Sequence, residues 1–184
     1  LWRRKNFFMS KIKCILFDMD GVLIDAKEWH YESLNRALGL FGFDISRYDH
    51  VHTFDGLPTR QKLDLLSKEK GLPKSLHPFI SELKQRYTME IVYTSCKPVF
   101  VRQMTLSKLK SSGYRLAVCS NAIRSSVEAM MQKGGLLEYL DFFLSNEDIK
   151  KSKPDPEIYQ MAMKRFGFTP QECVIVEDNP HGVE

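Results

Sequence analysis

The segment at residues 14–21, CILFDMDG, constrains this chain most. An apolar run typical of a buried β-strand ends in two carboxylates one residue apart, Asp18 and Asp20, and a glycine follows. Burying two like charges so close together raises the pKa of at least one of them unless a cation compensates. Such pairs are more often catalytic or metal-binding than structural. We therefore predict that Asp18 and Asp20 carry out chemistry at the end of this strand.

Helical and strand-like stretches alternate in the second half of the chain. The spacing of apolar residues predicts helices at 99–112, 124–133 and 156–166, and strands at 115–119, 142–144 and 173–176. Strands separated by helices of this length form a parallel sheet with right-handed crossovers and helices on both faces. The expected fold class is therefore α/β, with a doubly wound, Rossmann-like parallel sheet that begins with the strand before Asp18.

The region that follows the first strand has a different pattern. Residues 28–40, 60–66 and 78–87 show helical spacing, and no stretch between residues 25 and 95 predicts a strand. We expect residues 25–95 to form a helical insert, while residues 9–24 and 96–184 form a discontinuous α/β core. Residues 1–8 are expected to be an extension, with Met9 as the natural start because the chain begins with leucine.

Composition narrows the class of partner. The chain has 184 residues and a formal charge of +4, from 27 basic and 23 acidic residues that are scattered without long blocks, so we expect no nucleic-acid partner. No apolar run reaches the length of a secretory signal core or a membrane span, so we expect no membrane partner. The four cysteines fall in or directly after apolar strand-like runs without metal-ligand spacing, which indicates small buried side chains in a reducing compartment. A cytoplasmic monomer is the expectation.

Polar side chains follow the predicted strands at the points where ligands bind in sheets of this kind. Carboxylate oxygens bind magnesium, and a hydroxyl, backbone amides and an ammonium group neutralise phosphoryl oxygens. A site for magnesium and a phosphate group is therefore predicted at this edge. The candidate residues are Asp18, Asp20, Ser120, Asn121, Lys153, Glu177 and Asp178.

Each of these motifs alone has a simpler explanation. The acid pair could cap a helix or bind a structural calcium ion. Ser120 and Asn121 could form a turn or an N-cap, and the last two acids could belong to an ordinary turn after a strand. Lys153 lies in a basic loop that could simply be solvated. The functional interpretation therefore depends on the motifs occurring together.

In order and in type, the segments Asp18-Met19-Asp20-Gly21-Val22, Ser120-Asn121, Lys153-Pro154 and Glu177-Asp178 resemble the four motifs of the haloacid dehalogenase superfamily. The resemblance is to the branch with a helical cap inserted after the first motif, and it extends from about residue 11 to the end of the chain. It implies that residues 25–95 are such a cap. The first motif alone would be weak evidence, whereas four motifs in order are specific.

The resemblance implies a role for each residue. Asp18 is the expected nucleophile, which forms an aspartyl-phosphate, and Asp20 is the expected acid and base, protonated at near-neutral pH while Asp18 is ionised. Magnesium, the expected cofactor, would be held by Asp18, the Asp20 backbone carbonyl and Asp178, with Glu177 in support. Dehalogenases of the superfamily lack an acid at the position of Asp20, so its presence favours phosphoryl transfer.

The other two motifs would hold the phosphoryl group. The resemblance assigns this binding to Ser120, the backbone amide of Asn121, and Lys153. The expected partner is a small phosphorylated metabolite.

The cap should select the substrate. His30 stands where the β-phosphoglucomutase branch has a histidine that positions the acid/base aspartate, although a lone helical histidine is more often surface or core. Arg60 is a candidate substrate contact, one position out of register with the cap arginine of that branch, and Ala26 replaces its hinge threonine. His50 and His52 are expected to be bystanders in a loop.

The chain ends at Glu184, where the resemblance implies a further helix and at least one more strand. We therefore expect a C-terminally truncated core. The expected function is magnesium-dependent hydrolysis of a sugar phosphate or a phosphoglycolate-type substrate through an aspartyl-phosphate. A sugar phosphomutase is the alternative enzyme, and an inactive fragment or binding module is the alternative outside catalysis.

Overall fold

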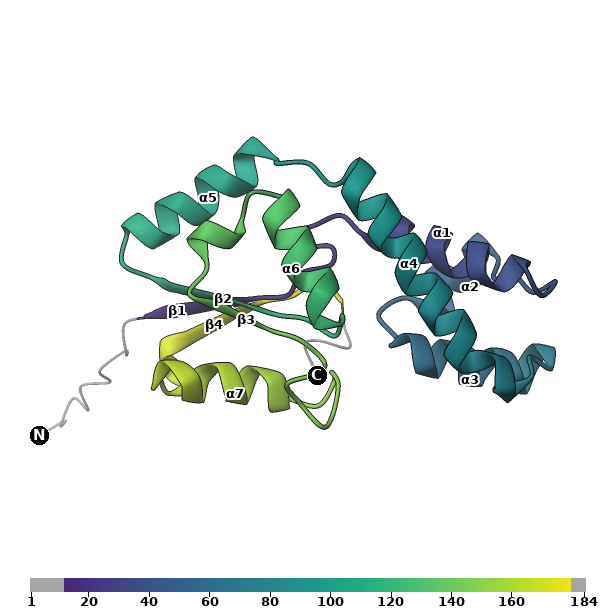
Figure 1. The fold of residues 1–184 in the computed structure, drawn as a ribbon. Helices are drawn as coiled ribbons and strands as arrows, with labels where there is room; N and C mark the ends of the chain where they lie inside the picture. Colours follow the sequence, from purple (N-terminus) through teal and green to yellow (C-terminus); the bar gives the residue numbers. More distant parts are fainter. Residues whose placement is uncertain (1–11, 180–184) are drawn as a thin grey trace, which may run out of the picture.

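Four parallel strands form the sheet of the α/β core in the computed structural model, which describes residues 12–179 (Figure 1). Their order across the sheet is β3-β2-β1-β4. The strands are β1 (Cys14–Phe17), β2 (Arg115–Cys119), β3 (Phe142–Leu144) and β4 (Cys173–Val176). This sheet confirms the expected doubly wound architecture. The predicted N-terminal extension and the C-terminal residues 180–184 lie outside the described residues.

The register of the strands places their carboxyl ends at one edge. Phe17 of β1 pairs with Val118 of β2 and with Val176 of β4. Because the three strands are parallel and end together, the residues that follow them meet at the same place. This alignment brings the first, second and fourth motifs together.

Helices cover both faces of the sheet. The helices α5 (Phe100–Ser111) and α6 (Arg124–Lys133) lie on one face, and α7 (Glu157–Phe166) lies on the other (Figure 1). Alternate residues of β2 point to opposite faces: Leu116 and Val118 join the cluster under α6, whereas Ala117 and Cys119 join the cluster under α7. Burial on both faces explains why the strands are continuous apolar runs.

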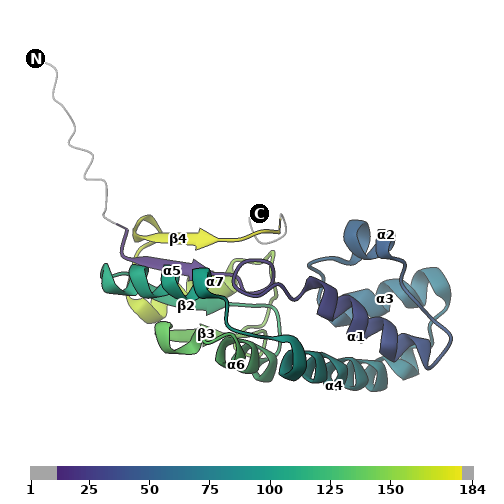
Figure 2. The same ribbon diagram turned by 90° about the horizontal axis from the view of Figure 1, so that it is seen from above.

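The helical insert lies beyond the carboxyl ends of the strands (Figure 2). Its two long, mutually packed helices are α1 (Lys27–Gly39) and α4 (His77–Ser95), and α3 (Thr59–Lys70) packs beside α4. It has an apolar cluster of its own, separate from those of the sheet, which includes Leu34, Leu38, Leu63, Leu66 and Ile80. The shorter elements are α2 (Arg47–Asp49), the π-helical turn η1 (His50–Phe54) and the 3-10 turn η2 (Lys74–Leu76).

The structure differs from the sequence-based expectation at two places in the insert. The predicted helix at 78–87 belongs to the longer α4, so Cys96 follows a helix and not a strand-like run. The predicted loop around His50 and His52 is instead helical, in η1. His50 is also buried and lines a cleft, so its placement in a loop was wrong, whereas its lack of a functional role stays a prediction.

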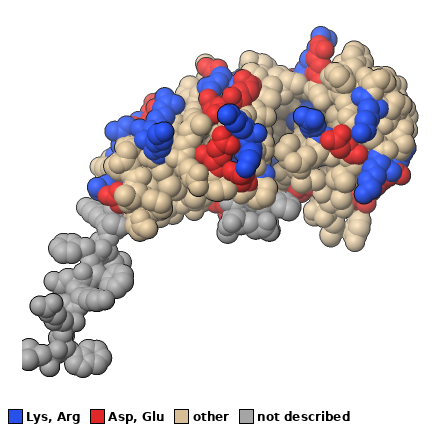
Figure 3. All heavy atoms as spheres, turned by 90° about the horizontal axis from the view of Figure 1, so that it is seen from below, with Lys and Arg blue, Asp and Glu red and all other residues tan. Residues whose placement is uncertain are grey.

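The structure also bears on the surface charges, on membrane-spanning helices and on the cysteines. Acidic and basic side chains are intermingled over the face shown in Figure 3, as the scattered charges of the sequence indicate. Within residues 12–179, no helix combines the length and apolar character needed to cross a bilayer. All four cysteines are free thiols, and Cys14, Cys96 and Cys119 are buried.

Candidate active site

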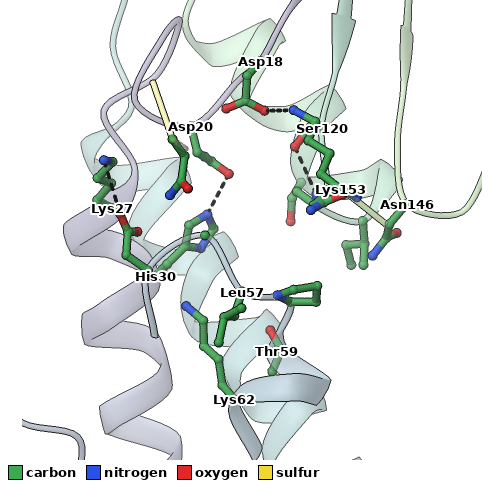
Figure 4. Close-up of a pocket in the computed structure, with 18 of the residues that line it drawn as sticks. Asp18, Asp20, Lys27, His30, Leu57, Thr59, Lys62, Ser120, Asn146 and Lys153 are labelled. Atoms are coloured by element: carbon green, nitrogen blue, oxygen red, sulfur yellow. Dashed lines mark hydrogen bonds and ion pairs between the residues drawn. The ribbon is translucent and has the colours of Figure 1, made fainter. Parts of the chain in front are cut away.

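A cleft of about 330 Å³ lies between the carboxyl edge of the sheet and the helical insert. The close-up in Figure 4 shows side chains from both units pointing into it. Every candidate residue from the sequence lines this cleft. They are Asp18, Asp20, His30, Arg60, Ser120, Asn121, Lys153, Glu177 and Asp178.

Asp18 follows β1 directly and is buried at the base of the cleft. Its backbone N–H donates to the carbonyl of Val176 at 2.9 Å, which continues the β1–β4 ladder by one residue. Lys153 Nζ donates to its Oδ1 atom at 2.6 Å (Figure 4). Burial raises the pKa of Asp18 to about 7, against the opposing effect of the Lys153 ammonium.

Asp20 has one engaged and one unengaged oxygen. Its Oδ2 atom lies 3.2 Å from Nε2 of His30, and Lys84 Nζ lies 3.2 Å from Nδ1 of the same ring. Its Oδ1 atom is buried and has no hydrogen-bond partner among the described residues. A buried carboxylate oxygen without a partner is costly, so this atom is available for a group that enters the cleft.

The pKa values of the two aspartates run opposite to the sequence-based expectation. Burial would raise the pKa of Asp20, but the charge and hydrogen bond of His30 and the charge of Lys84 outweigh it and lower that pKa below the usual value. Without magnesium or substrate, these neighbours favour a proton on Asp18 and not on Asp20, and the expected division of roles with magnesium bound stays a prediction. The sequence pointed to the two acids and to His30 beside Asp20, but not to Lys84 behind His30.

Lys153 connects two motifs. Besides Asp18, its Nζ atom contacts Oε1 of Glu177 at 2.9 Å, and the Tyr159 hydroxyl donates to the same Glu177 oxygen at 3.2 Å. Burial lowers the pKa of Lys153, but Asp18 and Tyr159 outweigh it and raise that pKa above its usual value. The group is therefore a fixed positive charge at the base of the cleft, and the hypothesis of a solvated basic loop does not apply to Lys153.

Ser120 and Asn121 lie in a turn after β2 and also line the cleft. The buried Ser120 Oγ accepts a hydrogen bond from the N–H of Ala122 at 3.0 Å, as expected for a turn after a strand. Asn121 Oδ1 accepts one from the N–H of Lys153 at 3.1 Å. The amide side chain of Asn121 thus ties the second motif to the third.

Three carboxylates form a group with the composition of a magnesium site. One oxygen from each of Asp18, Glu177 and Asp178 lies within 4.8 Å of the other two. Gly21 leaves room for the carboxylate of Asp178, because a Cβ atom at residue 21 would lie 2.1 Å from Asp178 Oδ2. The φ angle of Gly21 is +89°, which residues with a side chain rarely adopt. Hard carboxylate oxygens converging on one point fit magnesium. The side chain of Asp20 does not belong to this group.

Lys27, at the start of α1, joins the insert to the core. Its Nζ atom lies 2.9 Å from Asp178 Oδ2 and 3.3 Å from Asp55 Oδ2. Sequence reasoning missed this residue because its two partners are far from it in the chain. The insert approaches the core closely at Gly56 as well, since a Cβ atom at residue 56 would lie 2.5 Å from the side chain of Asn179.

Sequence reasoning also missed Lys62 and Lys84, which line the cleft from α3 and α4. A signal for Lys84 was available: it lies four residues after Ile80 and four before Thr88, and both of those are buried, so a lysine stands on the buried face of a helix. Arg60 lines the cleft from the first turn of α3 and is exposed, which leaves it free to contact a substrate.

Comparison with known proteins identifies related sequences over most of the chain. Residues 15–184 match the family described as haloacid dehalogenase-like hydrolase. A phosphorylated carbohydrates phosphatase from Thermotoga maritima is 28% identical over 176 residues, which are 94% of this chain and 79% of the relative. Pyrophosphatase PpaX from Bacillus velezensis is 30% identical over 180 residues, which are 95% of this chain and 78% of the relative.

Solved structures have the same fold. A β-phosphoglucomutase from Clostridium difficile matches with a TM-score of 0.81 and 22% identity, over 94% of this chain and 78% of the other. CbbY from Rhodobacter sphaeroides, in complex with phosphate, matches with a TM-score of 0.82 and 21% identity, over 94% of this chain and 80% of the other. These two likenesses establish the α/β core with its helical insert.

Proposed function

The chain belongs to the haloacid dehalogenase-like hydrolase family, and we propose that it is a magnesium-dependent phosphatase that hydrolyses a small phosphorylated metabolite through an aspartyl-phosphate. One observation carries the proposal. The carboxylate of Asp18, held by Lys153 at 2.6 Å, lines the same cleft as Asp20, whose buried Oδ1 atom has no partner among the described residues. A nucleophile and a proton carrier are thus available to one substrate.

The first half of the reaction transfers the phosphoryl group to the enzyme. A carboxylate oxygen of Asp18 attacks phosphorus, and the bond from phosphorus to the leaving oxygen breaks. Lys153, Ser120 and the backbone N–H of Asn121 line the cleft and would bind the phosphoryl oxygens. Protonated Asp20 gives its proton to the leaving oxygen, so the dephosphorylated product departs as an alcohol.

The second half returns the enzyme to its starting state. Asp20, now ionised, takes a proton from water, and the hydroxide formed attacks phosphorus of the aspartyl-phosphate. The bond from phosphorus to the Asp18 oxygen breaks, and inorganic phosphate is released. Asp18 ends as a carboxylate and Asp20 ends protonated.

Asp20 must gain a proton before the first half. The negative charge of a phosphorylated substrate next to Asp20 raises its pKa, which opposes the effect of His30 and Lys84. His30 contacts the Oδ2 atom and leaves the Oδ1 atom for the leaving oxygen. His30 is therefore proposed to position Asp20.

Magnesium is the proposed cofactor. Asp18, Asp178 and the backbone carbonyl of Asp20 would hold it, with Glu177 in support. The ion would supply positive charge that favours the ionised form of Asp18 and neutralises phosphoryl oxygens.

A sugar phosphomutase is the second candidate, favoured by the contact between His30 and Asp20 that the β-phosphoglucomutase branch implies. The two enzymes differ in whether the phosphoryl group passes to water or to a second hydroxyl of the sugar. Product analysis by ³¹P NMR separates inorganic phosphate from an isomeric sugar phosphate. The cytoplasmic location and the monomeric state stay predictions.

The test of the proposed function is the release of phosphate from an aryl phosphate. We expect hydrolysis that depends on added magnesium and that Asp18→Asn abolishes. Equal phosphate release by the unmodified protein and Asp18→Asn would exclude the catalytic role of Asp18. No release from any phosphate ester by either protein would favour the inactive binding module.

A further inference from the structure

Cys14 of β1 and Cys173 of β4 are in direct contact. The two residues are register partners in adjacent parallel strands (Figure 2), and the thiol of Cys14 donates to Sγ of Cys173 at 2.8 Å. Register partners on neighbouring strands point to the same face of a sheet, and both side chains belong to the apolar cluster under α7. Two residues 159 positions apart in the chain therefore bring their sulfur atoms together.

The backbone at this pair has the spacing that a disulfide needs. Neighbouring strands lie about 4.8 Å apart, which is within the roughly 4.4–6.8 Å that separates the Cα atoms of disulfide-bonded cysteines. Lys13 and Glu172, the residues just before the pair, hold the strands together. The N–H of Lys13 donates to the carbonyl of Glu172 at 2.8 Å, and their side chains form an ion pair at 2.5 Å. A bond between the two sulfur atoms is thus within reach of side-chain rotation alone.

The other two cysteines are not placed for this reaction. Cys96 follows α4 and lies in the cluster on the opposite face of the sheet. Cys119 shares the cluster under α7, but the partner of Cys14 on β2 is Arg115, four residues before Cys119. Four residues of a strand span about 13 Å, which is well beyond the reach of a disulfide. A disulfide in the folded chain is therefore specific to Cys14 and Cys173.

The two thiols differ in their access to an oxidant. Cys173 is partly exposed on β4, whereas Cys14 is fully buried. Burial raises the pKa of Cys14 to about 12, and the contact with Cys173 adds to this effect, so Cys14 stays a thiol. Oxidation by a small peroxide therefore begins at Cys173, and Cys14 stands next to it as the resolving cysteine.

We propose that Cys14 and Cys173 are a redox modification site, at which hydrogen peroxide converts the two thiols into a disulfide that ties β4 to β1. In the first step the Cys173 sulfur attacks one oxygen of the peroxide, the O–O bond breaks, and a sulfenic acid and water form. In the second step the Cys14 sulfur attacks the Cys173 sulfur and the S–O bond breaks. The proton of Cys14 leaves with the hydroxyl group as a second water, so two thiols lose two electrons and one peroxide is reduced.

The disulfide would act on the strand that carries two acids of the cleft. In the sheet of the described residues, β4 is an edge strand with β1 as its neighbour. It continues into Glu177 and Asp178, and Val176 at its end pairs with Phe17, the residue before Asp18. Segments with few contacts open more readily than the rest of a fold. A covalent bond at the start of β4 should hold this strand beside β1 and raise stability, because it also restricts the unfolded chain.

Peptide mapping tests the assignment directly. The reduced protein is treated with hydrogen peroxide, its remaining thiols are alkylated, and trypsin is added without reductant. We expect peptides 14–27 and 166–184 to be linked until dithiothreitol is added, with two alkylated thiols in place of four. The linked protein should migrate as a monomer on a non-reducing gel. A disulfide between other cysteines, a link between two copies of the chain, or no disulfide at all would overturn the proposal.

Serine variants separate this pair from general effects of peroxide. After oxidation the unmodified protein should melt several degrees higher, and dithiothreitol should reverse the change. Cys14→Ser and Cys173→Ser should show no rise, whereas Cys96→Ser, the matched control on the other face of the sheet, should respond as the unmodified protein does. Cys173 is partly exposed, so its variant keeps the test valid if Cys14→Ser fails to fold. A rise in Cys173→Ser, or no rise in the unmodified protein, would contradict the proposal.

Hydrogen–deuterium exchange locates the effect in β4. Oxidation should slow exchange of the amides of residues 173–178 more than exchange of the amides of α3, which lies in the insert. Equal slowing in both segments, or no slowing at residues 173–178, would show that the bond does not hold β4 and would overturn the proposal. None of these measurements depends on phosphate release, so their outcome is separate from that of the proposed function.

Discussion

Lys84 Nζ lies 3.2 Å from Nδ1 of His30, and the other ring nitrogen of His30 lies 3.2 Å from Oδ2 of Asp20. An ammonium group is only a donor, so Nδ1 must accept and Nε2 must carry the proton that is donated to Asp20. Burial and the charge of Lys84 lower the pKa of His30, which favours this neutral form of the ring. A lysine of α4 thereby sets the orientation and the tautomer of the residue that contacts the proposed acid and base.

This chain of contacts predicts an alkaline limit to activity. Burial lowers the pKa of Lys84 to about 8. Above that pH the lysine loses its charge, its hold on the tautomer of His30 weakens, and kcat should fall. Lys84→Arg stays protonated and should move the limit to higher pH, whereas Lys84→Met should show a low kcat without this limit. A pH profile of kcat measures the effect, and an identical alkaline limb in all three proteins would contradict it.

The same pKa predicts a dependence of stability on pH. Because the pKa of Lys84 is about 8 in the folded protein and 10.5 in the reference state, the unfolded chain binds more protons between these values. The free energy of unfolding of the unmodified protein should therefore rise with pH in this range relative to Lys84→Met, by roughly 3 kcal/mol in total. Urea titrations of both proteins at pH 7, 9 and 10.5 give the difference. A constant or falling difference would contradict the prediction.

Lys27 should compete with magnesium. Its ammonium lies 2.9 Å from Asp178 Oδ2, an oxygen of the proposed metal-binding group. In Lys27→Met this carboxylate has no competing cation, so the magnesium concentration for half-maximal phosphatase activity should fall several-fold. Lys68→Met is the matched control for lost positive charge, and it should have the value of the unmodified protein. A higher half-saturating concentration in Lys27→Met would contradict the role of competitor.

Alanine variants of two glycines with nearly the same φ angle separate the effect of backbone strain from an effect on the proposed metal site. Gly21 and Gly113 have φ values of +89° and +88°, but a Cβ atom meets Asp178 at the first and nothing within 4 Å at the second. Both alanine variants should lose about 1 kcal/mol of stability. Only Gly21→Ala should also need more magnesium, because it displaces the Asp178 carboxylate. Titration of phosphatase activity with magnesium compares the two, and equal magnesium requirements would contradict this account.

The α/β core was predictable because each of its strands is a short apolar run that ends in polar residues. Buried strands between covering helices leave this pattern in any sequence, and the order of the four motifs then located Asp18, Ser120, Lys153 and Asp178 at one edge of the sheet. The comparisons confirm the family that this order implied.

The environment of these residues was less predictable. The lowered pKa of Asp20 depends on His30 and Lys84, which approach it from the insert, whereas burial raises the pKa of Asp18. Lys27 and Lys62 face the cleft because of how α1 and α3 pack, which no local pattern specifies. The helical turn at His50 was missed because its five residues include only two apolar ones, Val51 and Phe54, which are too few to define a helical period.

In the proposed reaction, Asp18 becomes phosphorylated during turnover. Acid quenching during hydrolysis of an aryl phosphate with magnesium, followed by peptide mass spectrometry, tests it most directly. We expect one added phosphoryl group on the peptide that contains Asp18, formed within the first turnover and absent in Asp18→Asn. Steady phosphate release with no labelled peptide, together with an active Asp18→Asn, would contradict it.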